Sequence, residues 1–402
     1  MTSTKKYCAE ARCVSVLLVG LAMLWMVPFA IGWQETTPPR QLDAAWTKAY
    51  PNPEFPRLRP MSVTISENGR CAAVAANGTL EVINSTGRTT WRWDYGQINR
   101  FITPGTLAIS PFCDAIAMAG NSGYKYTWVA DRQGHSAYVR TASTPLAVTF
   151  DHEGKFVAIG TGGEDVLLIT RRGKLKWKRT LEQGWGLVGQ LSFSSDNRSI
   201  LVRGGYLVGA LDLDGGIVWS NTGLIRMSAA RDLQTFVGWF QPGHGTSHGI
   251  VVALDRAGKE LWTKDSQDPG AVISPSGDRI VARLSVGKQP SNTKPKQTPR
   301  NEDSLDEDDC ETALQVVSRD GAVLTTLPVQ DGTPIAISPD GERVLVRTQF
   351  GIEALELNGN RLFGIPLARW HFDDALVAED FSALLIVVRN GTNEQLKWYN
   401  LK

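Results

Sequence analysis

The sequence of 402 residues predicts an all-β protein assembled from repeats of one four-stranded unit. Glycine occurs 39 times and tryptophan 13 times, whereas methionine is scarce. Many glycines together with many aromatic residues are typical of short strands joined by tight turns. Two short motifs also recur along the chain and alternate with each other. Hydrophobic residues make up 42% of the chain and charged residues 21%, which excludes a fully disordered, a collagen-like or a multi-span membrane protein.

The first motif is an apolar stretch, a turn of the form Ser-x-Asp-Gly or a variant of it, and a second apolar stretch. Ser, Asp, Pro and Gly favour such turns because they bond to their own backbone or allow a positive φ. The motif recurs at a period of roughly 40 residues. Clear copies begin at Ile65, Ile109, Phe150, Phe193, Ile273 and Ile337, and degenerate copies begin at Ala229 and Ala378.

The second motif is a strand, an Asp or Asn, a Gly, and an aromatic residue four positions after that Gly. The clearest copies run from Ala210 to Trp219 and from Ala253 to Trp262. Further copies end at Trp91, Tyr138, Trp177 and Phe363, and the copy at Asp320-Gly321 lacks the aromatic residue. We expect these aromatic side chains to fill the space between neighbouring sheets.

Each repeat has room for four short strands, and a four-stranded sheet cannot bury both of its faces alone. Repeats of roughly 40 residues with four strands each are typical of a β-propeller, in which the sheets pack side by side around an axis. Residues 61–402, less one insert, provide about eight such blades. We therefore predict an eight-bladed β-propeller. Seven blades are the alternative, since two turns are degenerate, and a linear solenoid is the architectural alternative.

The two ends of the repeat region predict how the ring closes. The segment from Glu394 to Leu401 resembles a third strand with no fourth strand after it. Near the start, Ala45-Trp-Thr-Lys48 matches Leu261-Trp-Thr-Lys264, which opens a fourth strand. We therefore expect residues 42–50 to supply the outer strand of the last blade, which would remove an exposed sheet edge.

The N-terminal segment has the pattern of an export signal. Lys5, Lys6 and Arg12 precede an apolar run from Val14 to Trp33 that contains no charged residue. Small residues at Ala30 and Gly32 suit cleavage before Trp33. The run also approaches the roughly 20 residues that cross a bilayer.

Residues 1–32 are thus expected to form a signal peptide or an uncleaved N-terminal membrane anchor. Residues 33–41 are expected to be a linker, and residues 42–402 the propeller. In both cases the body lies outside the cytoplasm, either periplasmic, secreted or anchored to the inner membrane.

One segment interrupts the repeats. Residues 288–311 are basic and Pro-containing in their first half and acidic in their second, with almost no apolar side chains. Such a segment cannot bury enough surface to order itself, so we expect a disordered insert at about 288–309 in the sixth repeat. Binding of Ca²⁺ by the acidic run 302–311 is the alternative interpretation, but this run lacks the spacing and the Gly of an EF-hand.

The cysteines do not indicate a disulfide-built scaffold or a metal ribbon. Cys8 and Cys13 belong to the N-terminal segment, which leaves Cys71, Cys113 and Cys310, with no CxxC motif. Cys71 and Cys113 stand in strand-like stretches and are interpreted as small buried residues. One disulfide among the three remains open.

The sequence assigns no catalytic residue and no metal ligand, and it leaves any cofactor-binding residue unknown. The five histidines are His135, His152, His244, His248 and His371. The pair His244 and His248 lies in a Gly-rich connection without the Glu of an HExxH motif and is interpreted as a loop. His152 is interpreted as a turn residue.

Charge is balanced along most of the chain, with 42 basic and 41 acidic residues, so we expect no nucleic-acid partner. The exception is a basic stretch from Arg171 to Arg179 that alternates with apolar residues. On a strand, this pattern places cations on one face. Solvation of an outer strand is the plainer interpretation, and binding of an acidic partner or of membrane headgroups is the alternative.

The Ala-x-Asp-x-x-Gly-x-x-x-Trp copies resemble the tryptophan-docking repeats of quinoprotein-type eight-bladed propellers. These include pyrroloquinoline quinone (PQQ) alcohol dehydrogenases and the propeller subunit of the outer-membrane barrel-assembly machinery. The Ser-Pro-Asp-Gly turns are similar to those of WD40-like and TolB-like propellers. The resemblance covers about residues 42–402 and implies the fold. The adjacent cysteine pair of the dehydrogenases and a lipoprotein cysteine are both missing here, so neither specific function carries over.

These observations predict an exported, non-catalytic propeller that presents its loops and rim to a protein partner in the cell envelope. The alternative is a PQQ-type quinoprotein or another enzyme that uses the central channel, which requires polar side chains from several blades to meet at one channel mouth. A further alternative is carbohydrate or polymer binding by exposed tryptophans such as Trp185 and Trp239. Contact with the membrane is expected only through the N-terminal segment.

Overall fold

The computed structural model separates residues 39–402 as one compact unit from residues 1–38. It describes residues 40–402, apart from the ranges given at the end of this paragraph. Within the described residues no helix is long and apolar enough to cross a membrane. The predicted signal peptide or anchor lies outside the described residues. The ranges left out are 52–60, 77, 95–103, 121–123, 183–184, 206, 223–225, 241–247, 268–269, 287–310, 330–331, 368–370 and 391–392.

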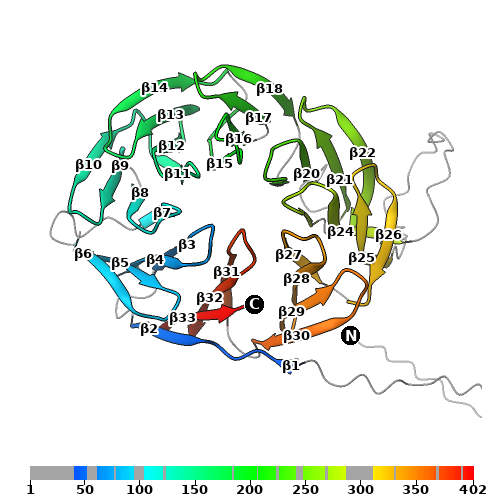
Figure 1. The fold of residues 1–402 in the computed structure, drawn as a ribbon. Helices are drawn as coiled ribbons and strands as arrows, with labels where there is room; N and C mark the ends of the chain where they lie inside the picture. Colours follow the sequence, from blue (N-terminus) through cyan, green and yellow to red (C-terminus); the bar gives the residue numbers. More distant parts are fainter. Residues whose placement is uncertain are drawn as a thin grey trace, which may run out of the picture. The chain divides into compact units, whose positions relative to one another are not determined.

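The described part of the chain is an all-β propeller of eight blades, each a four-stranded antiparallel sheet (Figure 1). Blades 1 and 2 comprise β3 (Met61–Ile65), β4 (Cys71–Ala76), β5 (Thr79–Asn84), β6 (Thr89–Asp94), β7 (Pro104–Ile109), β8 (Ala115–Gly120), β9 (Tyr126–Asp131) and β10 (Ser136–Arg140). Blades 3 and 4 comprise β11 (Pro145–Phe150), β12 (Phe156–Thr161), β13 (Asp165–Thr170), β14 (Leu175–Thr180), β15 (Gln190–Phe193), β16 (Ser199–Arg203), β17 (Leu207–Asp212) and β18 (Ile217–Thr222).

The remaining blades follow the same order from the innermost strand to the outermost. Blades 5 and 6 comprise β19 (Arg226–Ala229), β20 (Thr235–Phe240), β21 (His248–Asp255), β22 (Glu260–Gln267), β23 (Ala271–Ile273), β24 (Arg279–Val286), β25 (Glu311–Ser318) and β26 (Val323–Leu327). Blades 7 and 8 comprise β27 (Thr333–Ile337), β28 (Arg343–Thr348), β29 (Gly351–Glu356), β30 (Arg361–Pro366), β31 (His371–Val377), β32 (Ala383–Asn390), β33 (Asn393–Asn400) and β2 (Trp46–Pro51).

The predicted closure is confirmed. Strand β2 pairs antiparallel with β33, with Trp46 opposite Trp398, and so becomes the outer strand of blade 8. The chain reaches this position through β1 (Arg40–Gln41), which pairs in parallel with β30 of blade 7. Two residues of the predicted linker thus form a short strand. The eight blades also decide against the seven-bladed alternative.

The eight turns between the first and second strands of the blades share one geometry. In each, the amide of the fourth turn residue donates to the carbonyl of the first, as from Gly69 to Ser66 and from Gly341 to Ser338. The fourth residue has a positive φ in every copy, including the non-glycine Cys113 and Leu233. The degenerate copies in the sequence therefore form the same turn as the clear ones.

The spacing of the second motif, which repeats from blade to blade, places a tryptophan of one blade against a glycine of the next. Gly258 has a φ of +75°, and a Cβ added there would lie 2.8 Å from the ring of Trp219 in the preceding blade. The same arrangement joins Trp46 to Gly87, Trp177 to Gly215 and Trp262 to Gly321. In blade 6, which lacks the aromatic residue, Pro328 contacts Gly359 instead. These glycines serve both the turn conformation and the approach of the neighbouring ring.

Between the blades, the core is made of the faces of adjacent sheets. Buried clusters combine residues of consecutive blades, such as Val82 of blade 1 with Ile116 of blade 2, and Val74 of blade 1 with Leu385 of blade 8. Strands β24 and β25 flank residues 287–310, so the insert predicted at about 288–309 lies outside the described residues.

Candidate functional site at the channel mouth

The second residue of each inner turn forms a ring around the propeller axis. This position follows the turn's first residue. Proline suits it because the hydrogen bond within the turn does not use the amide of this residue. It holds Glu67, Pro111, His152, Ser195, Arg231, Pro275, Pro339 and Glu379 in blades 1 to 8. Neighbouring turns are joined directly, because the amide of Arg231 donates to Pro275 at 2.9 Å and that of Ser195 donates to Arg231 at 2.7 Å. We call this set the turn ring.

Four ionisable side chains of the turn ring meet across the channel. His152 Nδ1 lies 2.8 Å from Glu67 Oε2, which joins blade 3 to blade 1 past the proline of blade 2. Arg231 Nε lies 3.8 Å from Glu379 Oε2 and joins blade 5 to blade 8. Ligand atoms of Glu67, His152 and Glu379 all lie within 4.8 Å of one another.

Burial and charge shift the titration of this group. Burial of the His152 ring opposes protonation, but the hydrogen bond and charge of Glu67, with the charge of Glu379, outweigh it and raise the pKa of His152. For Glu379, burial between the channel walls raises the pKa, and the charge of Glu67 adds to it against those of His152 and Arg231. Its side chain keeps 45% of its surface accessible, so this burial is partial.

The second ring nitrogen of His152 is enclosed by protein. Nε2 is buried and has no hydrogen-bond partner among the described residues, although the nearby backbone carbonyl of Phe193 favours the protonated ring. A general base must reach the proton it removes. With Nδ1 against Glu67 and Nε2 buried, His152 is better placed to hold an ion than to exchange protons with a substrate.

A cavity of about 210 Å³ adjoins this group. It is lined by residues of the innermost strands β15, β19, β23, β27 and β31, which face the centre of the ring (Figure 1), and by His152, Arg231 and Glu379. The walls contributed by β23 and β27 are apolar, including Val272, Ile273 and Ile335. Sites for small organic ligands usually measure roughly 300–1,000 Å³. The cavity therefore suits an ion or a very small molecule better than a multi-ring cofactor.

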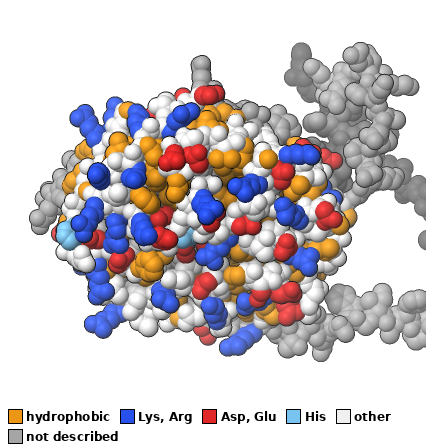
Figure 2. Space-filling view, turned by 45° about the horizontal axis from the view of Figure 1, so that its top comes forward, with side chains coloured by type: hydrophobic (Ala, Val, Ile, Leu, Met, Phe, Trp, Pro, Cys, Tyr) orange, Lys and Arg blue, Asp and Glu red, His pale blue; other side chains and the backbone are white. Residues whose placement is uncertain are grey.

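The basic stretch of the sequence forms the outer edge of blade 3. Strand β14 ends its sheet, and Lys174, Lys176, Lys178 and Arg179 are exposed along it or just before it. Lys178 pairs with Asp165 at 2.9 Å. Among the described fourth strands, β14 combines three cations with no carboxylate, whereas β6 and β22 carry both signs. Figure 2 shows Lys and Arg side chains spread over the face in view, with Asp and Glu among them. We call the exposed cations of β14 and its preceding turn the basic edge.

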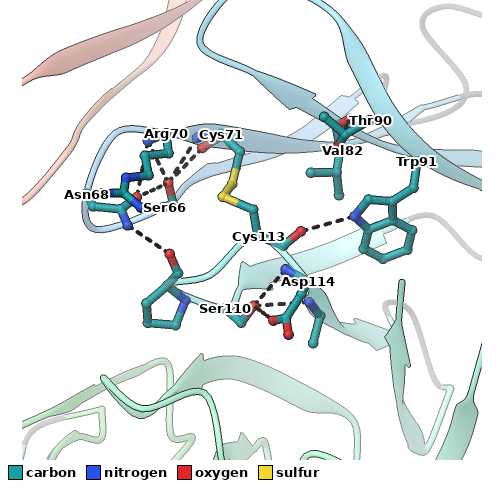
Figure 3. Close-up of a disulfide and its surroundings, with 12 residues drawn as sticks. Ser66, Asn68, Arg70, Cys71, Val82, Thr90, Trp91, Ser110, Cys113 and Asp114 are labelled. Carbon is teal, nitrogen blue, oxygen red and sulfur yellow. Dashed lines mark hydrogen bonds between the residues drawn. A yellow bond between two sulfur atoms is a disulfide. The ribbon is translucent and has the colours of Figure 1, made fainter. Parts of the chain in front are cut away.

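Cys71 and Cys113 are joined by a disulfide, which corrects their interpretation as separate buried residues (Figure 3). The bond links the start of β4 in blade 1 to the inner turn of blade 2. Beside it, Trp91 Nε1 donates to the carbonyl of Cys113 at 3.1 Å, and Asn68 Nδ2 donates to that of Pro111 at 2.9 Å. Cys113 occupies the positive-φ position that holds glycine in four of the other inner turns.

Other residues singled out by the sequence do not gather into a site. His244 lies outside the described residues, and His248 begins β21. His135 pairs with Asp131 at 3.0 Å within one outer turn. The expectation of an exposed Trp185 is wrong, because its side chain is 2% exposed in the core, and Trp239 is half-buried against another core cluster. The buried Trp185 indole therefore offers no open face for sugar binding.

The sequence predicts His152 as a turn residue, and its motifs single out none of Glu67, Arg231 and Glu379. An alignment of the eight turns on their first residue would have shown four ionisable residues at one repeat position. A scan against protein-family models and a search of curated proteins found no match to this chain.

Proposed function

We propose that this protein is an exported, non-catalytic β-propeller that binds an acidic protein partner in the cell envelope through its basic edge. The main support is the uneven charge of the fourth, outermost strands of the blades. Each of the other described fourth strands has at most one cation. Strand β14 has three cations and no carboxylate. Unlike-charge surfaces steer partners together and fix their register.

Two further features support this proposal. The disulfide between Cys71 and Cys113 suits an oxidising compartment, in agreement with the export pattern of residues 1–32. The ring is closed by β2 on β33, which gives a rigid scaffold for an exposed binding edge. Lysines on an edge strand also prevent sheets from pairing with each other, so the same residues keep copies of the chain apart.

Tryptophan docking between blades supports membership of the quinoprotein-type propeller superfamily. We propose this relationship for the fold and not for the function. The channel-mouth group is the one feature that favours the alternative of a channel-sited cofactor. The cavity of about 210 Å³ argues against a quinone there. Quinone recovered from the purified protein would support that alternative and contradict the scaffold proposal.

The test is charge reversal of two exposed cations in each of two blades. In blade 3, Lys174→Glu with Arg179→Glu removes two exposed cations of the basic edge that pair with no carboxylate among the described residues. In blade 5, Arg256→Glu with Lys259→Glu makes the same change in charge, within the outer turn between β21 and β22. Affinity capture of the exported body from envelope extracts, followed by mass spectrometry, is expected to recover a partner with wild type and the blade 5 variant, weakly with the blade 3 variant.

Binding to that partner is also expected to weaken as salt rises, because the exposed charges are screened. Equal capture by both variants, or binding that is insensitive to salt, would contradict the proposal. Binding of the blade 3 edge to anionic vesicles without any protein partner would favour membrane headgroups instead and also count against it.

A further inference from the structure

We propose that Glu67, His152 and Glu379 bind one divalent transition-metal ion of the Zn²⁺ class at the channel mouth. This site is independent of the basic edge and goes beyond the proposed function. The three side chains come from blades 1, 3 and 8, and their ligand atoms lie within 4.8 Å of one another. Their convergence follows from the turn ring, which gives all three the same place in the repeat.

The donor set decides the class of ion. One imidazole and two carboxylates suit Zn²⁺ and related first-row metals, whereas Ca²⁺ and Mg²⁺ prefer oxygen ligands alone. Three protein ligands are also typical of zinc sites that keep a fourth position for water or a small ligand. Here the fourth position faces the cavity of about 210 Å³ that His152 and Glu379 help to line.

His152 is held as a metal ligand would be. Its Nδ1 faces Glu67, whereas its Nε2 is buried and has no hydrogen-bond partner among the described residues. Nδ1 is therefore the ring nitrogen that binds the ion. Zinc bonds of about 2.0–2.2 Å place ligand atoms roughly 3.3 Å apart, so the 2.8 Å contact between His152 and Glu67 has to open by about half an ångström.

Arg231 lies on the outer side of this group. Its Nε is 3.8 Å from Glu379 Oε2, and its side chain is 51% exposed. A guanidinium beside one ligand repels a second cation, so it weakens the site rather than completing it. This gives the proposal a distinctive consequence, because removal of Arg231 should tighten metal binding, whereas removal of a ligand should weaken it.

The experiment is a Zn²⁺ titration of the purified chain after chelator treatment, by calorimetry and by metal analysis after dialysis. One Zn²⁺ per chain is expected. His152→Gln and Glu379→Gln are each expected to weaken binding at least tenfold, and Arg231→Gln is expected to tighten it. His135→Gln is the matched control, since His135 has the same contact with one carboxylate, at 3.0 Å, without a second carboxylate ligand beside it.

Co²⁺ provides a second measurement, because its visible absorption reports the ligands directly. A spectrum of low-coordinate Co²⁺ is expected with wild type and with His135→Gln, and its loss is expected with His152→Gln. Circular dichroism of each variant shows whether it has folded. Folded wild-type protein that binds no stoichiometric Zn²⁺, or Zn²⁺ binding that survives both ligand variants, would overturn the proposal and leave a metal-free ion-pair cluster.

Discussion

The indole rings of Trp46 and Trp398 stack 5.7 Å apart at an interplanar angle of 18°. These residues face each other in the register of β2 and β33, from opposite ends of the folded chain. Trp46 also packs on Gly87 and donates from Nε1 to Ser85 O at 3.1 Å, so one side chain joins blade 8 to blade 1. The ring closes at this contact.

Truncation of Trp46 tests that closure. Trp46→Ala removes the stacked ring and the contact with blade 1, and we expect the free energy of unfolding to fall by about 3 kcal/mol. Thr47→Ala is the control, because Thr47 is exposed on the opposite face of the same strand. Urea denaturation followed by fluorescence measures both variants, and equal stabilities would show that the seam does not depend on this indole.

The disulfide is expected to stabilise blades 1 and 2 against unfolding. Its two cysteines are 42 residues apart, and a closed loop of that length contributes about 4 kcal/mol in the chain-entropy account, with measured values commonly about 2–4 kcal/mol. Cys71→Ala with Cys113→Ala should therefore lower the denaturation midpoint, as should a reductant on the wild type. Peptide mapping under non-reducing conditions checks the link, and pairing of either cysteine with Cys310 would contradict it.

Two glycines separate the effect of a positive φ from that of tryptophan docking. Gly134 has a φ of +89° with nothing within 4 Å of an added Cβ, whereas Gly258 has a φ of +75° with the Trp219 ring 2.8 Å away. Gly134→Ala should cost only the conformational penalty, about 1 kcal/mol. Gly258→Ala should cost a further 1–3 kcal/mol or so because the ring must move. Thermal unfolding compares the two, and equal losses would mean that docking adds nothing.

Acid is expected to weaken the Ser-x-Asp-Gly turns. The hydrogen bond from Ser338, aided by the Glu342 amide and by Arg343, lowers the pKa of Asp340 below its ordinary value of 3.8 against the opposing effect of burial. A depressed folded pKa gives stability that is complete above about pH 4 and is lost as pH falls through the folded value. The stability difference between wild type and Asp340→Ser should therefore shrink in acid.

Serine is a suitable replacement because Ser276 holds this position in blade 6, where it contacts Ser274 at 3.1 Å. Urea titrations at about pH 7 and about pH 3 measure the difference. Asp196→Ser in blade 4 is an independent repeat, since Ser194 lowers the pKa of Asp196 in the same way. A difference that stays constant with pH would show that these carboxylates do not support the turns.

The architecture could be predicted because it is encoded locally and many times. Turn residues and aromatic spacing repeat in each blade, so degenerate copies such as Ala378-Glu-Asp-Phe-Ser382 could be placed by their neighbours. The seam could be predicted because Trp46 carries the same local pattern as Trp262. In blade 6, which lacks the aromatic residue, Pro328 lies against the glycine of the next blade instead.

The channel-mouth group could not be predicted in this way because it depends on contacts across the ring. Glu67 and His152 are ordinary residues of two turns, and only the closed ring brings them to 2.8 Å. The disulfide pairing was left open for a related reason. Cys113 stands where other turns carry glycine, and its partner is fixed by the packing of blade 1 on blade 2.

The position of β2 has a consequence for assembly. This strand joins its sheet along a single edge, by the register that runs from Trp46 to Pro51, and its partner comes from the far end of the propeller. Long-range pairing of this kind forms late in folding. Until then the open ring accepts the same strand from another molecule, so refolding of concentrated protein should yield domain-swapped dimers that dilution converts to monomers.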